Sequence, residues 1–288
     1  MIPNRKALVS IGLLVIAGTV QAATSINTCP FAITAPGDYL LAADLICGGG
    51  NGISILSSDV TLALEGHRIT AGEGANYAIS NFSSSGEITR VEHVRVLGPG
   101  LITNGGGNAF RIGVFFFHVD NSEVSGITVL GSMGSGIAAT GDFLTITGNT
   151  LGRNGSGTIA GAIGLIGVHF STISGNDVSG NNESGLDARD VVASGPLGTV
   201  SHNIFNGNTT NGLFVVAGDF TGATIQHNIA VGNGANGIGL GTADGPAEVT
   251  NNTSLANGNF DLADFTPNCT GHVWSGNKFF TANQSCIH

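Results

Sequence analysis

Asparagine recurs along this sequence at a nearly constant interval, and this repeat constrains the fold more than any other feature. Six asparagines form one column, with intervals of 27, 27, 25, 24 and 25 residues: Asn149, Asn176, Asn203, Asn228, Asn252 and Asn277. Five residues further on in each repeat, a second column consists of Asn154, Asn181, Asn208, Asn233 and Asn257. Two columns in a fixed relation indicate a repeat protein, in which each unit stacks on a copy of itself.

Each repeat contains short segments in which apolar and polar residues alternate, as they do in β-strands. Leu144 and Ile146 would face one way and Thr145 and Thr147 the other, and later repeats keep mostly Thr or Ser at the outward positions. Asn and Gly between these segments tolerate the left-handed backbone of tight turns. A unit of this size buries its apolar side only by stacking. The sequence therefore predicts an all-β solenoid of parallel strands with about nine coils.

Other architectures fit this sequence less well. A β-sandwich or antiparallel barrel gives no reason for the asparagine columns, and a leucine-rich repeat lacks its leucine framework here. Gly accounts for 47 of the 288 residues and charged residues for only 10%. A disordered chain of this length would carry more charge or proline, and collagen would have Gly at every third position. The formal net charge of −10 disfavours nucleic acid as a partner, because phosphate binding needs a basic face.

Residues 1–22 have the pattern of a secretory signal peptide. Arg5 and Lys6 precede an apolar stretch at 7–20, and residues 20–22 fit cleavage after a small side chain. A transmembrane anchor is the alternative, but this stretch is shorter than the ~20 residues that a spanning helix needs. We expect a secreted or periplasmic protein with no membrane span after signal removal. The sequence leaves the oligomeric state open.

Four cysteines lie near the ends of the expected mature chain: Cys29, Cys47, Cys269 and Cys286. Three pairings are possible, and the sequence alone does not choose among them. Pairing of neighbours along the chain would close one short loop at each end, and export favours disulfides over the alternative, a zinc site. The expected β-solenoid domain, 23–288, then comprises a cap and first coil (23–58), central coils (59–265), and a last coil with a disulfide cap (266–288).

Two segments carry a resemblance to a known superfamily. ITAPGDYLLAADLIC (33–47), followed by VTLALEGHRITA (60–71), is similar to the first coils of many exported right-handed parallel β-helix proteins, a group that includes pectate-lyase-like and copper-site-accessory members. The resemblance extends over most of the mature chain and implies a right-handed, single-stranded parallel β-helix. It also implies a protein that acts on or binds extracellular polysaccharide, as a lyase, hydrolase or epimerase.

Two enzyme motifs of this superfamily are missing from the sequence. They are the paired Asp with Gly-His-Gly of polygalacturonases and the Arg-x-Pro-x-x-Arg of pectate lyases. The fold also hosts many unrelated activities. The alternative function is therefore a non-catalytic secreted rod that binds glycans or surfaces, or that serves as a scaffold.

The best candidates for catalysis occupy the same position in three successive repeats. Asp120, Asp142 and His169 each lie four residues before a core position of the first strand, and His118 lies close to Asp120. With the repeats in register, these side chains stack at one edge of a sheet. Two carboxylates and an imidazole so arranged can share protons or hold a cation such as Ca²⁺. The alternative is that they are ordinary turn residues that cap loop backbone.

A second cluster, expected to bind substrate, is Asp187, Arg189 and Asp190 in the sequence GLDARD. Asp187 and Arg189 share one face of a strand, where neighbouring repeats have apolar or small residues. The charged pair therefore interrupts an otherwise uncharged surface. The alternative is a surface ion pair that has no ligand.

Overall fold

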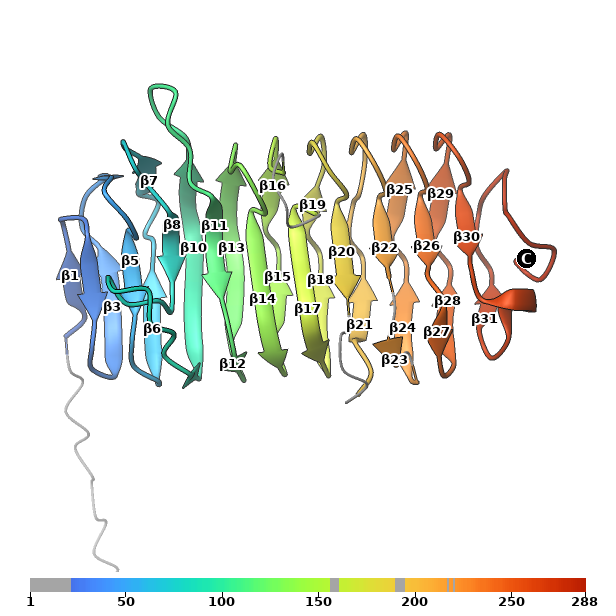
Figure 1. The fold of residues 1–288 in the computed structure, drawn as a ribbon, viewed down its shortest axis with the longest axis horizontal. Coiled ribbons are helices and arrows are strands. Elements are labelled where there is room, and N and C mark those ends of the chain that lie inside the picture. Colours follow the sequence, from blue (N-terminus) through green and yellow to red (C-terminus); the bar gives the residue numbers. More distant parts are fainter. Residues whose placement is uncertain (1–21, 156–160, 190–194, 217, 220) are drawn as a thin grey trace, which may run out of the picture.

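The computed structural model describes residues 22–155, 161–189, 195–216, 218–219 and 221–288, which form a rod of stacked coils (Figure 1). The signal peptide expected at 1–22 lies outside these residues except for its last position. Two long parallel sheets, here called sheet A and sheet B, run along the rod. Every pairing between named strands is parallel within the described residues, as the asparagine columns predict. The predicted solenoid of about nine coils is confirmed.

The main path of sheet A passes, in order, through β1 (Thr24–Ile26), β3 (Gly37–Leu41), β6 (Val60–Ala63), β10 (Val94–Thr103), β13 (Glu123–Leu130), β15 (Thr145–Thr147), β18 (Ser171–Ser174), β21 (Gly198–Ser201), β24 (Ala223–Gln226), β28 (Ala247–Thr250) and β31 (Val273–Ser275). Four further strands extend sheet A: β4 (Leu45–Cys47), β7 (Arg68–Ala71), β16 (Thr150–Gly152) and β19 (Asp177–Val178).

Sheet B consists, in order, of β2 (Phe31–Ile33), β5 (Ile53–Ile55), β8 (Tyr77–Ser80), β11 (Ile112–Phe116), β14 (Ile137–Asp142), β17 (Ile163–His169), β20 (Leu186–Arg189), β22 (Leu213–Val215), β26 (Ile238–Leu240) and β30 (Leu262–Asp264). The remaining elements are three short parallel pairs and one 3₁₀ turn: β9 (Val91–Glu92) with β12 (Val119–Asp120), β23 (Gly218–Asp219) with β27 (Ala243–Asp244), β25 (Ile229–Val231) with β29 (Thr253–Leu255), and η1 (Pro267–Cys269).

The core is a stack of aliphatic side chains inside the coils. In sheet A, Ile146, Ile173 and Val200 are register partners on successive strands, and each is buried. The alternate positions point outward, where Thr145, Thr172 and further hydroxyl side chains form a row. This alternation follows the two-residue period of a strand, so each coil gains its core only from the coils on either side.

The two asparagine columns form continuous hydrogen-bonded ladders inside the turns. The backbone N–H and Nδ2 of Asn149 both donate to Oδ1 of Asn176, each over 3.0 Å, and Nδ2 also donates to the carbonyl of Val124 at 2.9 Å. The same pattern repeats along the first ladder to Asn277 and along the second to Asn257. Because every coil repeats these bonds, the ladders fix the register of the stack.

Both ends of the rod are held by disulfides, and the neighbouring cysteines are the partners. Cys29 pairs with Cys47 at the first coil, and Cys269 pairs with Cys286 at the last. The second asparagine ladder ends on the buried carboxylate of Asp261, whose Oδ1 accepts hydrogen bonds from the backbone and Nδ2 of Asn257. Among the described residues, none of the helical segments has the length and apolar character needed to cross a bilayer.

Candidate functional site

The four residues predicted for catalysis all line a hollow at one edge of sheet B; they are His118, Asp120, Asp142 and His169. The hollow, here called the acid–base hollow, has a volume of about 410 Å³. Its lining residues come from consecutive coils: Arg90, Phe117, His118, Asp120, Thr140, Gly141, Asp142, Ile166, Gly167 and His169. The sequence-based expectation that these repeats bring Asp120, Asp142 and His169 together is met by the geometry. Their chemical role stays a prediction.

The position of Asp142 is set by an irregularity in β14. The register between β14 and β17 shifts after Ala139, and Asp142 becomes the direct partner of His169. Gly141 makes the shift feasible, because its φ is 129° and a Cβ atom there would lie 2.2 Å from the carbonyl oxygen of Val119. The strand end that carries Asp142 thus packs directly on the preceding coil.

A chain of contacts links the polar groups of the acid–base hollow. Nδ1 of His169 lies 2.8 Å from Oδ1 of Asp142, and the His169 side chain is only 7% exposed. The backbone N–H of Asp142 donates to Oδ1 of Asp120 at 3.0 Å, and Nη2 of Arg90 donates to Oδ2 of Asp120 at 2.9 Å. An ionised carboxylate only accepts hydrogen bonds, so Asp142 in that form fixes a proton on Nδ1 of His169 and orients the ring.

Asp120 is held in its ionised form. Partial burial raises its pKa, but the hydrogen bonds from the Asp142 backbone and the Arg90 side chain, with the nearby charges of Arg90 and His118, outweigh burial and lower the pKa below its ordinary value. The same contact raises the pKa of Arg90. Asp120 is therefore a poor proton carrier near neutral pH. The groups of the hollow that remain for proton transfer are Asp142, His169 and His118.

His118 lies at the rim of the acid–base hollow. It is exposed, has a φ of 55°, and its backbone N–H donates to the Thr140 hydroxyl at 2.7 Å. Its ring packs edge-on against Phe117, with ring centroids 4.4 Å apart. These contacts fix the position of His118, whose exposed side chain lines the hollow.

The second predicted cluster forms an ion pair beside this hollow. Nε of Arg189 donates to Oδ1 of Asp187 at 2.7 Å, and Nη2 lies 3.3 Å from Oδ2. Asp187 is buried, with 5% exposure, whereas the Arg189 side chain is 47% exposed, so the pair is more than a surface contact. Arg189 is the register partner of Ile166, which lines the acid–base hollow. Asp190 lies outside the described residues.

The sequence offered Asp120 and Asp142 as candidate ligands for a cation such as Ca²⁺, without assigning one. Within the described parts of the chain, no group of three or more His, Cys, Asp or Glu side chains is arranged to hold a metal ion. The local contacts of Asp120 and Asp142 instead go to Arg90, His169 and backbone.

A match to a sequence model of a protein family shows which family this chain belongs to. A sequence model of the right handed beta helix region matches residues 77–254, which is more than half of the chain. The chain belongs to the right-handed β-helix family. No curated protein matches this β-helix protein in sequence.

Solved structures share the fold of this β-helix protein at low identity. The A-module of mannuronan C-5 epimerase AlgE4 from Azotobacter vinelandii is 15% identical, covers 80% of this chain and 72% of its own, and has a TM-score of 0.54. The AlgE6 A-module from the same organism is 13% identical, covers 84% of this chain and 71% of its own, and has a TM-score of 0.50. The tailspike protein of E. coli bacteriophage HK620, in complex with a pentasaccharide, is 12% identical, covers 84% of this chain and 58% of its own, and has a TM-score of 0.47. The likeness to the two epimerase modules shows the fold alone.

Sequence reasoning missed several residues at the site of this β-helix protein. Arg90 precedes the regular repeats, and nothing in the sequence connects it with Asp120. Phe143 and Phe170 directly follow Asp142 and His169; they are about half exposed, and their rings stack with centroids 5.3 Å apart. Because each Phe directly follows a member of the Asp120, Asp142 and His169 column, the sequence could have predicted that the two rings stack.

Proposed function

We propose that this β-helix protein acts on an extracellular polysaccharide by proton transfer in the acid–base hollow. The observation that carries the proposal is the Asp142–His169 pair, in which an exposed carboxylate holds a buried imidazole at 2.8 Å beside Arg90 and His118. Structural neighbours support the choice of substrate class, because they include enzymes named as mannuronan C-5 epimerases. The reaction class is a lyase, hydrolase or epimerase reaction.

Groups that line the hollow, and neighbouring groups from the same coils, have distinct parts in this proposal. Asp142 and His169 accept and return a proton at the sugar, with the ring orientation fixed through Nδ1. Arg90 and Arg189 offer positive charge to an acidic sugar unit, each already anchored by an aspartate. His118 lies at the rim, where a glycan entering the hollow would meet it. Phe143 and Phe170 give the sugar an apolar surface next to the reacting groups.

The protein is proposed to work outside the cytoplasm. Two disulfides are typical of proteins in oxidising compartments. Residues 1–22 are proposed as the export signal, and 23–288 as the mature β-helix domain. This location agrees with a polysaccharide substrate that is itself extracellular.

The test is turnover of a panel of uronate-containing and neutral polysaccharides. We expect new reducing ends, unsaturated products or epimerised units, and a loss of about 100-fold or more in the rate for Asp142→Asn and His169→Gln. Asp44→Asn is the matched control, because Asp44 also contacts a histidine, His67, at 3.2 Å but lies outside the hollow. Equal rates for wild type and Asp142→Asn on every polysaccharide turned over would rule out the assignment.

A second function is a non-catalytic rod that binds glycans through sheet A. The observation that favours it is the outward row of Thr145, Thr172, Thr199 and Thr224, which are register partners and present hydroxyls to solvent. Measurable affinity for a glycan without product formation, reduced by Thr199→Val and unchanged by Asp142→Asn, would select this function over the first.

A further inference from the structure

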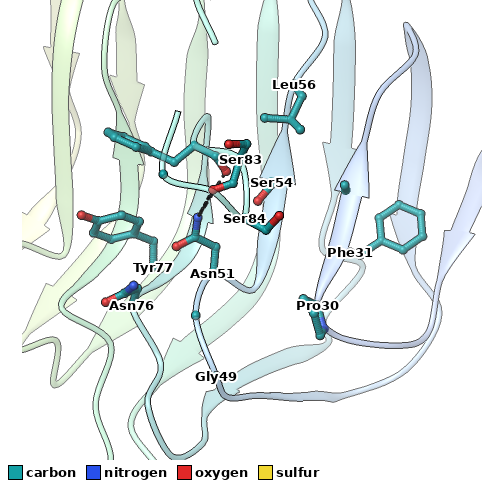
Figure 2. Close-up of a pocket in the computed structure, with 14 residues that line it drawn as sticks. Pro30, Phe31, Gly49, Asn51, Ser54, Leu56, Asn76, Tyr77, Ser83 and Ser84 are labelled. Atoms are coloured by element: carbon teal, nitrogen blue, oxygen red, sulfur yellow. Dashed lines mark hydrogen bonds between the residues drawn. The ribbon is translucent and has the colours of Figure 1, made fainter. Parts of the chain in front are cut away.

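A second hollow opens on the outer face of sheet B, near the N-terminal end of the rod. It has a volume of about 540 Å³ and is here called the aromatic hollow (Figure 2). Its floor comes from β2, β5 and β8, and the loop that follows β8 forms one wall. The residues that line it include Phe31, Tyr77 and Phe82, together with Asn51, Asn76 and Ser83, and none of its lining residues is Asp, Glu, Lys, Arg or His.

The wall of the aromatic hollow is fixed before any ligand arrives. Nδ2 of Asn51 donates to the carbonyls of Phe82 and Ser83. Figure 2 shows Asn51 pointing towards the loop that carries Ser83. Asn81, which is fully buried, donates from Nδ2 to the carbonyls of Thr89 and Phe117, each over 2.7 Å, and its Oδ1 accepts from the Phe117 N–H. A wall anchored on both sides loses little conformational entropy on binding.

Aromatic rings extend from this hollow towards the acid–base hollow. Phe82 stacks on Phe115 with centroids 5.0 Å apart, and Tyr77 lies 5.5 Å from Phe82. Phe117 lies 6.4 Å from Phe82 and also lines the acid–base hollow beside His118. All four rings are partly exposed. These four rings, here called the aromatic strip, therefore offer a continuous apolar surface between the two hollows.

We propose that the aromatic hollow binds an uncharged sugar unit of a glycan chain that extends across the aromatic strip to the acid–base hollow. One face of a pyranose ring presents C–H groups, which pack on an aromatic ring through dispersion and loss of apolar hydration. The amides of Asn51 and Asn76 and the Ser83 and Ser84 hydroxyls supply hydrogen-bond partners for ring hydroxyls. A lining without charge favours a neutral sugar over a uronate.

This inference deepens the proposed function and rests on it only for the choice of a glycan as ligand. It adds that the ligand carries neutral units at one end of the site. A single free sugar would not reach both hollows, so the ligand is an oligosaccharide or polysaccharide. Occupancy of the aromatic hollow requires no proton transfer.

The test is direct binding of neutral and acidic hexasaccharides, measured by calorimetry on the full chain. The neutral probes are the hexamers of cellulose, xylan and mannan, and the acidic probes are hexagalacturonate and hexamannuronate. We expect at least one neutral probe to bind wild type, with a tenfold or greater loss for Phe82→Ala. Phe280→Ala is the matched control, because Phe280 is 81% exposed and lies near the other end of the chain.

Asn76→Ala keeps the test valid should Phe82→Ala fail to fold. Asn76 is exposed at the hollow, so its truncation leaves the packing intact, and we expect a three- to tenfold loss of affinity. Asp142→Asn should retain binding of the neutral probe, which separates this inference from the proton-transfer proposal. Binding of acidic probes alone, no binding of any neutral probe, or equal affinity for wild type and Asn76→Ala would overturn the inference.

Discussion

At the scale of single residues, the ladder asparagines stabilise the fold because every polar atom of a buried amide has a partner. Asn203 is fully buried; its Oδ1 accepts from the backbone and side chain of Asn176, and its Nδ2 donates to Ile173 and Asn228. A buried polar group that loses its partner costs about 1–3 kcal/mol. The ladders therefore penalise any coil that slips out of register.

Replacing one inner ladder residue should be strongly destabilising. Asn203→Ala leaves the N–H and Nδ2 of Asn176 and the carbonyl of Ile173 without their present partner, and we expect the free energy of unfolding to fall by about 3 kcal/mol or more. Asn182→Ala is the control, because Asn182 is exposed beside the second ladder and should change stability by less than about 0.5 kcal/mol. Equal denaturation midpoints for the two variants would contradict this role of the ladder.

The buried carboxylate of Asp264 should make the C-terminal end of the rod sensitive to acid. Burial raises its pKa, but contacts with His272, Trp274 and the backbone of Thr266 outweigh burial and lower the pKa below the ordinary value. A carboxylate with a lowered folded-state pKa stabilises the fold above its unfolded pKa, about 3.9, and this stabilisation is lost as the pH falls through the folded value.

We therefore expect the melting temperature to fall as the pH drops below about 4. Asp264→Asn should melt at a lower temperature than wild type at pH 7. Its melting temperature should fall by less than that of wild type when the pH is lowered. Fluorescence of Trp274, the single tryptophan of the chain, reports directly on this region. An acid dependence in the Asp264→Asn variant as steep as in wild type would show that other groups control it.

At the scale of elements, strand alternation and turn chemistry were readable from the sequence, whereas strand irregularities were not. The position before Asn203 and Asn228 has a left-handed backbone and is occupied by His202 and His227, with φ near 56°. Earlier repeats have Gly there, and this substitution pattern marks the turn. The register shift in β14 has only Gly141 as a mark in the sequence, and a single Gly does not reveal that Asp142 and His169 become direct register partners. A bulge depends on the packing of neighbouring coils, which one strand's sequence does not encode.

The C-terminal disulfide should stabilise the last coil. Cys269 and Cys286 are 17 residues apart, and closing a loop of that size contributes about 3 kcal/mol in the chain-entropy model. We expect the Cys269→Ser, Cys286→Ser double variant to lose roughly that amount, measured by guanidinium unfolding. A double variant with unchanged unfolding free energy would indicate that the hydrogen bonds around Asp264 hold this end alone.

At the scale of the whole molecule, the rod is a one-dimensional stack. Each coil contacts the coils before and after it, so a disturbance at one end propagates mainly through adjacent interfaces. The ends of such a stack need protection, and the disulfides Cys29–Cys47 and Cys269–Cys286 lie in the first and last coils. Both hollows lie on sheet B, whereas the outward threonine row of the alternative function lies on sheet A.

Local opening should follow this geometry. In the Cys269→Ser, Cys286→Ser variant, we expect amide hydrogen exchange to accelerate in β28 and β31 while β10 and β13 keep their wild-type protection. Wild-type chain measured in parallel is the reference. Faster exchange along the entire rod would instead mean that the stack opens as one cooperative unit.

The sequence by itself determined the coil period, the parallel stacking, the outward threonine row and the column of Asp120, Asp142 and His169. The first three recur along the repeats, and the column occurs in three successive repeats, so stacking of the coils one strand spacing apart brings the equivalent positions together. Only the tertiary structure decided the cysteine partners, the contact of Arg90 with Asp120, and the aromatic hollow. These depend on the paths of irregular loops, because side chains far apart in sequence and outside the repeat meet only where the folded chain brings them together.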